Sequence, residues 1–566
     1  MCGIIGRVGS DVLKDVVDGL KNLEYRGYDS YGLCATRGGS HFLHKGVGII
    51  SRDFDTRNKE EFLAGIGHTR WATHGEVSVE NAHPQYDEKE TIFVVHNGTV
   101  ENSPPSVLDT QHIVRSLNHK VSTEEDFVII IRGVLQNLKG SNAFLVLHQN
   151  FPDRIFCAAK GTSSLIVTEN GYVSSDVNAI AGKAEEATRI ENSVVCLCED
   201  SILYDEDTKR NFQPVPKNSD SVEIDEAHYM LKEINEQPQI VKRRDTKINK
   251  TPPARINLIG CGSSYYAAML GKIWFEEICK IPTTVTYGSE AIYGLNDAGA
   301  TDIYISQSGE TKDIIYAVEN RQGQEEKNAY VITNNLDSHL ANMGFNCIDI
   351  SSGPEYGVAA TKTFTMTCAR LWEMAYDWRH EQSSNSLVGR TSFLSGLSKG
   401  IERVLDRTEE IKSLAEELHE YDNFLFLGRH KDYPIALEGA LKLKEISYIH
   451  AEGMPAAEMK HGPIALVDES TPSIFVVCGR SNLDPIISNM REIKSRGGLV
   501  IAICDNVCFS RIKEVADWTH GQYNVYGDDL KPLVANVALQ LFAYYVALNR
   551  NCNPDRPRNL AKSVTV

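Results

Sequence analysis

The sequence predicts an α/β protein in three parts, a domain of short mixed strands followed by two copies of a parallel α/β unit. The chain has 566 residues, which at roughly 150 residues per domain corresponds to three to four domains. Its first part reads as short strands separated by Gly, Asn and Asp turn signals. After Ala227 strand, turn and helix alternate, a pattern typical of parallel α/β units.

The N-terminal part carries more strand signals than helix signals. The expected strands are Gly32 to Thr36, Ile92 to His96, Ala143 to His148 and Ser193 to Cys198, and helical periodicity covers Asp11 to Leu23 and Asp126 to Leu138. A polar run from Asn211 to Ser221 indicates a linker. We therefore expect a layered α/β domain over residues 1–213 and a linker over residues 214–225.

One spacing recurs in the second part of the chain. The strand signal from Arg255 to Leu258 leads into Gly260, and that from Phe424 to Leu427 leads into Gly428, each before a helical stretch. Three pairs of residues lie 168 positions apart: Gly260 and Gly428, Glu290 and Glu458, and Gly294 and Gly462. The shared offset predicts a duplicated unit, with copies at 226–387 and 388–548 and a C-terminal tail at 549–566.

The composition excludes several classes of protein. The chain has 58 basic and 76 acidic residues, a formal net charge of −18, so nucleic acid and anionic membranes are not expected partners. No apolar run approaches the roughly 20 residues of a membrane helix, and the N-terminus lacks the features of a signal peptide. The 13 cysteines have no paired metal-ligand spacing, which favours reduced thiols in a cytoplasmic protein without a bound metal.

Cys2 directly follows the initiator Met. Removal of that Met leaves a thiol beside its own α-amine, whose pKa of about 7.7–8.0 suits it to act as a base. A thiol and an adjacent amine form a self-contained pair of nucleophile and base. A cysteine at this position alone usually has no such role, so the neighbouring motifs decide the interpretation.

Four motifs accompany Cys2. They are Y-R-G-Y-D-S from Tyr25, G-H-T-R-W-A-T-H-G from Gly67, N-A-H-P from Asn81 and V-H-N-G from Val95. Together with Cys2 they resemble the glutamine amidotransferases of the N-terminal-cysteine class, and the resemblance covers the N-terminal domain. It implies an N-terminal nucleophile (Ntn) hydrolase-type αββα fold in which Cys2 attacks the side-chain amide of glutamine. Asn97 and Gly98 would form the oxyanion hole.

The same resemblance implies a set of glutamine-binding residues. Arg70 would bind the α-carboxylate as a bidentate partner, and Asp109 would bind the α-amine. Trp71 and His74 complete the set, with Trp71 also gating an ammonia passage. Trp71 also suits simple core packing, and the histidines of these motifs also suit core or turn positions. Only seven residues separate Glu101 from Asp109, fewer than the family usually has, so we expect the glutamine pocket to close differently.

Two hydroxyl-rich turns in the duplicated part suggest a phosphate site. Gly260-Cys261-Gly262-Ser263-Ser264 begins like a dinucleotide fingerprint but has Tyr265 in place of the third glycine, and the chain has no Walker-type loop. Ser306-Gln307-Ser308-Gly309-Glu310-Thr311 follows a strand signal and precedes a helix signal. Backbone N–H groups at a helix start, with hydroxyls, can hold a phosphate. An ordinary helix cap is the alternative for either turn.

These turns, with two α/β copies, resemble sugar isomerase (SIS) domains, which are three-layer αβα folds with parallel sheets. Further strings follow at V-A-A-T-K from Val358, A-L-E-G-A-L-K-L-K-E-I-S-Y from Ala436 and K-H-G-P from Lys460, and the chain ends P-R-N-L-A-K-S-V-T-V. With the amidotransferase motifs in front, the whole chain resembles the glutamine–fructose-6-phosphate aminotransferase (isomerizing) family. Departures are Ser263, Ala360 and Tyr31, where the family commonly has other residues, and a missing final Glu.

The resemblance assigns roles in the sugar half. Glu445 would move a proton between sugar carbons 1 and 2, His461 would open the fructose ring and Lys562 would form a Schiff base with the keto carbon. Glu438, Lys442 and Glu445 share one helix face, although such spacing usually marks a solvated salt-bridge stripe. Residues expected to bind the sugar phosphate are Ser263, Ser264, Ser306, Gln307, Ser308, Thr311, Val358, Ala360 and Lys442.

The resemblance implies a reaction that converts glutamine and fructose 6-phosphate into glutamate and glucosamine 6-phosphate. Ammonia would pass through a channel between two sites, and no cofactor is expected. The family resemblance also implies a homodimer through the SIS half, in which His461 serves the neighbouring subunit. Two alternatives stay open. One is a phosphosugar-binding regulator, which Glu445, His461 and Lys562 argue against. The other is a phosphoribosyl- or asparagine-type amidotransferase, which the absence of their nucleotide and pyrophosphate loops disfavours.

Overall fold

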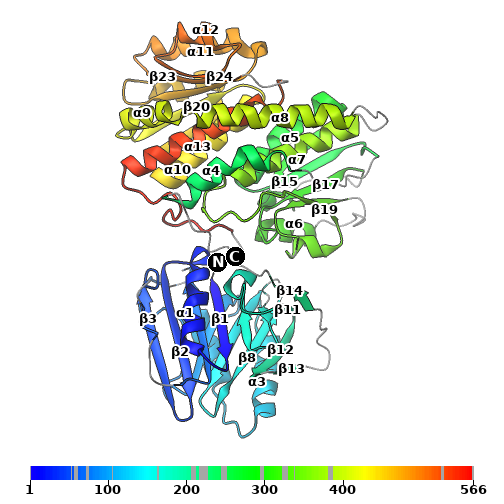
Figure 1. Ribbon diagram of the computed structural model, residues 1–566, viewed down its shortest axis with the longest axis vertical. Coiled ribbons are helices and arrows are strands. Elements are labelled where there is room, and N and C mark those ends of the chain that lie inside the picture. The colour runs from blue at the N-terminus through cyan, green and yellow to red at the C-terminus, as the bar shows by residue number, and fades with distance from the viewer. Residues whose placement is uncertain are drawn as a thin grey trace. The chain divides into compact units, whose positions relative to one another are not determined.

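The computed structural model describes residues 2–51, 54–56, 61–71, 75–104, 106–161, 163, 165–199, 201–204, 212–215, 227–243, 251–293, 299–320, 329–336, 338–379, 386–523 and 528–563. The chain forms two compact units (Figure 1). Unit 1 comprises Met1–Glu223 with Ser563–Val566, and unit 2 comprises Ile224–Lys562.

Unit 1 contains two antiparallel sheets within its described residues. The first has the strand order β14-β11-β9-β10-β1-β4-β2-β3, with β1 (Gly3–Val8), β2 (Ser30–Arg37), β3 (Ser40–Val47), β4 (Ala64–Arg70), β9 (Leu165–Val167), β10 (Tyr172–Ser174), β11 (Glu186–Ile190) and β14 (Phe212–Pro214). The second has the order β13-β12-β8-β7-β6-β5, with β5 (Gln85–Tyr86), β6 (Ile92–Gly98), β7 (Asn142–His148), β8 (Phe151–Lys160), β12 (Ser193–Cys198) and β13 (Ser201–Tyr204).

Helices cover the outer faces of these sheets. Helix α1 (Val12–Asn22) packs on β1 and β4 of the first sheet, and α2 (Asp109–Leu117) and α3 (Glu124–Asn137) pack on the second. The inner faces share a core that includes Ile4, Ile66, Val95 and Leu145. Unit 1 is therefore a four-layer α/β/β/α structure (Figure 1). The expected strands and both expected helices of this part are present, with shifts of a few residues at their ends.

Unit 2 contains two parallel sheets of five strands each in its described residues. The first has the order β16-β15-β17-β18-β19, with β15 (Ile256–Gly260), β16 (Thr283–Tyr287), β17 (Thr301–Ile305), β18 (Tyr330–Thr333) and β19 (Asn346–Asp349). The second has the order β21-β20-β22-β23-β24, with β20 (Asn423–Gly428), β21 (His450–Pro455), β22 (Ser473–Val477), β23 (Val500–Asp505) and β24 (Trp518–Tyr523). The order is the same in both, and Gly260 and Gly428 end corresponding strands, so the predicted duplication is confirmed. Gly294, one of its markers, lies outside the described residues.

Each parallel sheet has helices on both faces. The helices of unit 2 are α4 (Tyr229–Ile240), α5 (Ser263–Trp274), α6 (Lys312–Asn320), α7 (Lys362–Arg379), α8 (Ser386–Leu405), α9 (Thr408–Leu418), α10 (Asp432–Ser447), α11 (Leu483–Lys494), α12 (Phe509–Lys513) and α13 (Lys531–Asn549). In β15 successive side chains point to opposite faces: Leu258 packs with α5 and α7, and Ile259 packs with α6. In β20 Phe426 packs with α10 and α13, and Leu427 packs with α11.

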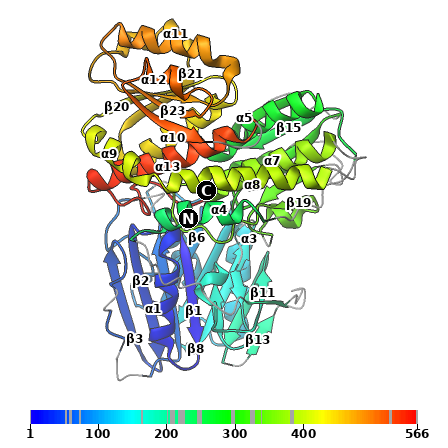
Figure 2. The ribbon, with the colours of Figure 1, turned by 45° about the horizontal axis from the view of Figure 1, so that its top comes forward.

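One core joins the two halves of unit 2. Trp274 of α5, Trp372 of α7, Leu443 of α10 and Leu539 of α13 belong to the same buried cluster. The four helices lie together in Figure 2. The start of α5 is therefore held near α10, which belongs to the other half. Helix α13 is the one described helix long and apolar enough to cross a membrane, but 83% of its apolar window is buried in the protein, as in a core helix.

The expected domain divisions fall on identifiable elements. Strand β14 reaches Pro214, and the expected linker beyond residue 215 lies outside the described residues up to residue 226. The expected division at residues 387 and 388 lies in the first turn of α8. The expected tail begins at Asn549, where α13 ends.

Candidate functional site

In unit 1 the Cys2 thiol lies against the main chain that follows β4. The N–H of Trp71 donates to Cys2 Sγ at 3.4 Å, and the thiol lies 3.6 Å from the Trp71 carbonyl oxygen. The Cys2 carbonyl accepts a hydrogen bond from Arg26 Nε at 3.3 Å. The antiparallel register of β1 and β4 pairs Gly3 with Thr69, so Cys2 comes next to Arg70. A half-buried thiol beside a guanidinium is suited to act as a nucleophile.

Arg70 ends β4 and its side chain faces a turn and the start of α2. The residue is 5% exposed, and burial lowers the pKa of its guanidinium while Cys2 and Asp29 act in the opposite direction. Its Nη1 donates to the Glu76 carbonyl at 3.3 Å. A Cβ at Gly75 would lie 2.8 Å from Leu108 Cδ2 and 3.8 Å from Arg70 Nη2. A cation in such an enclosed place is suited to binding a carboxylate.

Asn97 and Gly98 end β6, and Asp109 begins α2. Gly98 has φ +140°, and a Cβ there would lie 2.2 Å from the Ser141 carbonyl oxygen, so only glycine fits. Asp109 Oδ2 accepts the N–H of Val100 at 2.9 Å. This hydrogen bond joins Asp109, at the start of α2, to Val100, which follows the expected oxyanion-hole residues Asn97 and Gly98 in the chain. His74 lies outside the described residues.

Three buried histidines connect the strands that carry these groups. His68 Nε2 lies 2.9 Å from the His96 carbonyl oxygen and 3.1 Å from His83 Nδ1. Thr110 Oγ1 lies 2.8 Å from His83 Nε2, and His96 Nε2 lies 2.9 Å from Asn142 Oδ1. Burial lowers the pKa of His68 to about 3 and that of His96 to about 4. These histidines are neutral at physiological pH, and they link β4 to β6 rather than face a substrate.

In unit 2 the hydroxyl-rich turn after β17 is closed by its own side chains. Ser306 Oγ accepts the Gly309 N–H at 3.0 Å and lies 2.8 Å from Thr311 Oγ1. Ser308 Oγ accepts the Glu310 N–H at 3.1 Å. Gly309 has φ +66°, and a Cβ there would lie 1.9 Å from Ser338 Oγ. The turn is thereby preformed before α6, as an anion site requires. Gln307 lies in the same turn, and its carbonyl accepts the Asn334 N–H at 3.0 Å.

The helix face predicted from sequence meets the start of α5. Lys442 Nζ lies 2.6 Å from Glu445 Oε2 and 3.4 Å from Glu438 Oε1. Ser263 Oγ donates to Glu438 Oε1 at 3.1 Å, and Ser264 is the next residue of α5. The Glu438 and Lys442 side chains are 0% and 1% exposed, so the interpretation as a solvated stripe is wrong.

Charge and burial compete within this cluster. Burial raises the pKa of Glu438 to about 7, and the Glu445 carboxylate adds to the rise while Lys442 opposes it. Burial would lower the pKa of Lys442, but Glu438 and Glu445 together raise it. The ammonium of Lys442 therefore stays charged, and Glu445, which is 19% exposed, is the member of the pair that reaches toward solvent.

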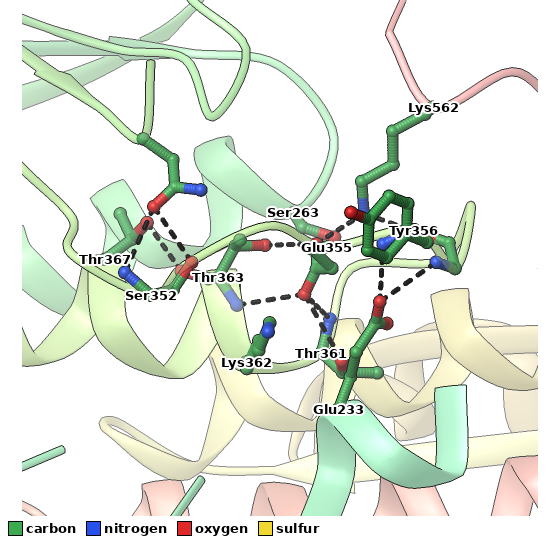
Figure 3. A network of polar contacts seen from close by, with 12 residues as sticks. Glu233, Ser263, Ser352, Glu355, Tyr356, Thr361, Lys362, Thr363, Thr367 and Lys562 are labelled. Atoms are coloured by element: carbon green, nitrogen blue, oxygen red, sulfur yellow. Dashed lines mark hydrogen bonds and ion pairs between the residues drawn. The ribbon is translucent and has the colours of Figure 1, made fainter. Parts of the chain in front are cut away.

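Lys562 reaches from the C-terminal tail to a buried carboxylate, as Figure 3 shows. Its Nζ pairs with Glu355 Oε2 and donates to the Gly357 carbonyl at 2.7 Å. Glu355 Oε1 also accepts the N–H groups of Thr361 and Thr363, both at 3.0 Å. Burial alone would raise the pKa of Glu355, but Lys562 and these hydrogen bonds hold it at about 2.

Sequence reasoning missed two acidic residues here. Glu355 stands three residues before the V-A-A-T-K string, and Glu233 lies in α4 at 2% exposure. Glu233 Oε1 accepts the N–H groups of Tyr356 and Gly357 (Figure 3). No local pattern marks either one, because each gains its partners only when α4, the 355–363 segment and the tail fold together.

The remaining expected residues lie as follows. The Val358 N–H donates to the Asp555 carbonyl at 3.2 Å, and Ala360 lies half-buried before α7. His461 lies exposed in a turn after β21, and no hydrogen bond or ion pair among the described residues joins it to Glu445 or Lys562. The described residues contain no group of three or more His, Cys, Asp or Glu arranged to hold a metal ion.

Comparison with known proteins identifies relatives for the whole chain. The SIS domain family matches residues 251–376 and 417–550. The glutamine–fructose-6-phosphate aminotransferase (isomerizing) of Aquifex aeolicus is 36% identical over 614 aligned positions covering all of both chains. That of Methanosarcina acetivorans is 35% identical over 625 positions, again with full coverage of both. These alignments are longer than the 566 residues of the chain, so it lacks segments that the relatives have.

A solved structure resembles unit 2. The C-terminal domain of glucosamine-fructose-6-phosphate aminotransferase from Francisella tularensis is 33% identical. It covers 60% of this chain and 100% of its own, with a TM-score of 0.55. Both matched segments of the SIS family lie in unit 2, one over each parallel sheet.

Proposed function

Because the chain belongs to the glutamine–fructose-6-phosphate aminotransferase (isomerizing) family and is such an enzyme, we propose that its two units carry the two half-reactions. Residues 1–213 form the glutaminase domain, of the Ntn hydrolase type. Residues 226–387 and 388–548 form two SIS domains after a linker at 214–225, and the tail at 549–566 completes the sugar site. The observation that carries this assignment is the buried ion pair of Lys562 and Glu355, which holds a lysine in the interior of unit 2.

In the glutaminase half Cys2 attacks the side-chain amide of glutamine. Its α-amine takes the thiol proton, ammonia leaves, and water hydrolyses the glutamyl thioester. The Asn97 amide and the Gly98 N–H stabilise the oxyanion. Arg70 binds the α-carboxylate, as its enclosed position beside Cys2 supports. Asp109 binds the α-amine, and Trp71 and His74 are further glutamine-binding residues.

In the sugar half the two hydroxyl-rich turns bind the phosphate of fructose 6-phosphate. The binding residues are Ser263, Ser264, Ser306, Gln307, Ser308, Thr311, Val358, Ala360 and Lys442. His461 opens the ring, and the Lys562 amine adds to the keto carbon and expels water to give a Schiff base. Ammonia then displaces Lys562, and Glu445 moves a proton between carbons 2 and 1 to give glucosamine 6-phosphate. The charged Lys442 orients Glu445, which its 2.6 Å contact supports.

The nitrogen moves between the halves as free ammonia in a closed passage. Ammonia released into water is protonated and loses its nucleophilicity, so exclusion of water is the physical requirement. Trp71 gates the passage, as its contact with the Cys2 thiol supports. No metal or organic cofactor takes part in the proposed steps.

The enzyme works in the cytoplasm as a homodimer through its SIS half. His461 is exposed and has no hydrogen bond or ion pair to Glu445 or Lys562 among the described residues, which supports a role in the neighbouring subunit's site. Free cysteines throughout the described residues agree with a reducing compartment.

The test is an assay of purified protein with glutamine and a panel of phosphosugars, with the product identified by mass spectrometry. We expect glucosamine 6-phosphate and glutamate in equal amounts from fructose 6-phosphate, and no amino sugar from aldose phosphates. Folded protein that makes glutamate but no glucosamine 6-phosphate would contradict the assignment of unit 2.

A further inference from the structure

Helix α4 is fastened to the tail and to the segment before α7. The Asp555 carboxylate accepts the N–H groups of Tyr229 and Met230 at 2.9 and 2.8 Å, at the first turn of the helix. The next turn brings Glu233 to the backbone of Tyr356 and Gly357. The helix that begins unit 2 therefore contacts both segments that meet at Lys562.

Glu233 holds the main chain from which Lys562 takes a hydrogen bond. Its Oε1 accepts the N–H of Gly357 at 3.1 Å, and the carbonyl of the same residue accepts Lys562 Nζ at 2.7 Å. A Cβ at position 357 would lie 2.9 Å from Glu233 Oε2, so with any other residue there the carboxyl group would have to shift. The Oε2 atom is buried without a hydrogen-bond partner among the described residues.

The carboxyl groups of Glu233 and Glu355 and the ammonium of Lys562 thus lie together in the protein interior. Glu355 and Lys562 form the ion pair, and their charges balance. A second carboxylate at Glu233 would add an unbalanced buried charge, which is costly. Burial, then the charge of Glu355, raise the pKa of Glu233 to about 8, and Lys562 opposes the rise. The nearby charged residues Glu236 and Lys362 pair with each other on the next turn of α4.

We propose that Glu233 is a positioning residue of the sugar site, which fixes Gly357 against Lys562 and, by keeping its own proton, leaves that lysine with a single counter-charge. This inference rests on the proposed Schiff-base role of Lys562. Glu233 does not touch the substrate, and it acts through the Tyr356–Gly357 main chain and through charge.

The proton on Glu233 determines how the reactivity of Lys562 depends on pH. Burial and the charge of Glu355 keep the proton on Glu233 up to about pH 8, because they raise its pKa to about that value. Above that pH Glu233 ionises, and the Lys562 side chain then faces two carboxylates in place of one. A second negative charge favours the ammonium over the free amine that attacks the sugar.

The test compares wild type with Glu233→Gln and Glu233→Asp in single-turnover trapping. Enzyme is mixed with fructose 6-phosphate and cyanoborohydride between pH 6.5 and 9.5, and modification of Lys562 is followed by peptide mass spectrometry. Ring opening is common to all three proteins, so the ratio of variant to wild-type rate is the readout. Glutamine retains the hydrogen-bond acceptor but cannot ionise, whereas aspartate retains the charge but is one methylene too short to reach both N–H groups.

We expect the wild-type rate to rise less steeply above about pH 8 than the Glu233→Gln rate, so that the ratio of the Glu233→Gln rate to the wild-type rate grows severalfold between pH 6.5 and 9.5. Glu233→Asp should be slower than wild type at every pH, and the KM for fructose 6-phosphate should change less than about threefold in both variants. Glu236→Gln, the same change three residues along α4, is the matched control and should follow the wild-type profile.

Three results would overturn the inference, and they are distinguishable. Wild-type protein that is never modified at Lys562 would remove the Schiff-base role and the inference with it. Modification of Lys562 with the same pH profile in wild type and Glu233→Gln would leave the proposed function intact and refute the role of Glu233. A parallel loss of rate at all pH values in both variants, with lowered thermal stability, would likewise reduce Glu233 to a structural residue.

Discussion

The two proposed nucleophiles, Cys2 of unit 1 and Lys562 of unit 2, lie in different surroundings. Cys2 is half-buried, and its described hydrogen bonds are to main-chain atoms and to Arg26. The Lys562 side chain is 8% exposed and faces a carboxylate that is fully buried. The position of the Cys2 thiol is set by the neighbouring ends of β1 and β4. The charge of Lys562 is balanced by a carboxylate in a site built from three segments that are distant in sequence: α4, residues 355–363 and the tail.

That difference predicts how substitutions at each site change the reaction rate and the stability. The Cys2 side chain is small, so its replacement by alanine removes the proposed nucleophile and costs little stability. A buried ion pair that loses one partner leaves a lone charge away from water, which costs several kcal/mol. Substitutions in unit 1 should therefore change rates, and substitutions in unit 2 should change both rates and stability.

The largest effect is expected for Cys2→Ala. Removing the proposed nucleophile of the glutaminase half should lower glutamine hydrolysis by about 10⁵-fold or more. Isomerisation in unit 2 should persist, because Lys562 and Glu445 are intact. Cys347→Ala, which removes an exposed thiol of β19, is the control and should match wild type. Loss of isomerisation in Cys2→Ala would mean that the units do not work separately.

Lys562→Ala should lower synthesis of glucosamine 6-phosphate by about 10⁴-fold or more, because no Schiff base can form. Hydrolysis of glutamine should stay measurable. The control is Lys242→Ala, which removes a lysine that is 51% exposed in unit 2. Synthesis at the wild-type rate in Lys562→Ala would contradict the covalent role.

Glu355→Ala should lower the free energy of unfolding of unit 2 by about 3–5 kcal/mol, since it leaves the Lys562 ammonium buried without its partner. Chemical denaturation, followed by hydrogen exchange in peptides of each unit, separates the two transitions. The matched control is Glu452→Ala, at an exposed position of β21. An unchanged transition in unit 2 would show that Lys562 finds another partner or water.

The smallest effect per residue is expected from pH. The pKa of His68 is about 3 in the folded protein against 6.5 for the free side chain, so the folded state binds fewer protons than the unfolded state between those values. Stability is thus full above pH 6.5 and falls as the pH drops, by about 2 kcal/mol per such histidine between pH 6.5 and 5.

Hydrogen exchange at pH 7 and pH 5 tests this difference between the units. His68, His83 and His96 all lie in unit 1, whereas His520 is the one histidine with a comparably lowered pKa in the described part of unit 2. Protection in β4 and β6 should therefore fall more than protection in β15 and β20. Equal loss in both units would contradict the role of the histidine network.

The fold was largely predictable from sequence because its signals are local or repeated. The strand at Ser193–Cys198 has the bounds that its residues predict, and Gly260 and Gly428 end corresponding strands of the two parallel sheets. The helix face of Glu438, Lys442 and Glu445 was also predictable, because i, i+4 and i+7 positions share one side. Its burial was not, because that depends on α5 packing against α10.

The surroundings of Lys562 could not be predicted for the same reason. Glu233, Glu355 and Lys562 are separated by more than 100 residues from one another, and no periodicity relates them. The role of the histidines near Cys2 could not be predicted for a different reason. Their motifs suggested either a site or a core, and only the distances among His68, His83 and His96 identify a buried network.

The central claim is that the amide nitrogen of glutamine reaches fructose 6-phosphate inside one enzyme. The direct measurement is synthesis from glutamine labelled with ¹⁵N in the amide, in the presence of excess unlabelled ammonium, with the isotope content of glucosamine 6-phosphate read by mass spectrometry. The account predicts product that carries ¹⁵N almost completely, whatever the ammonium concentration. Product whose label is diluted in proportion to the added ammonium would contradict it.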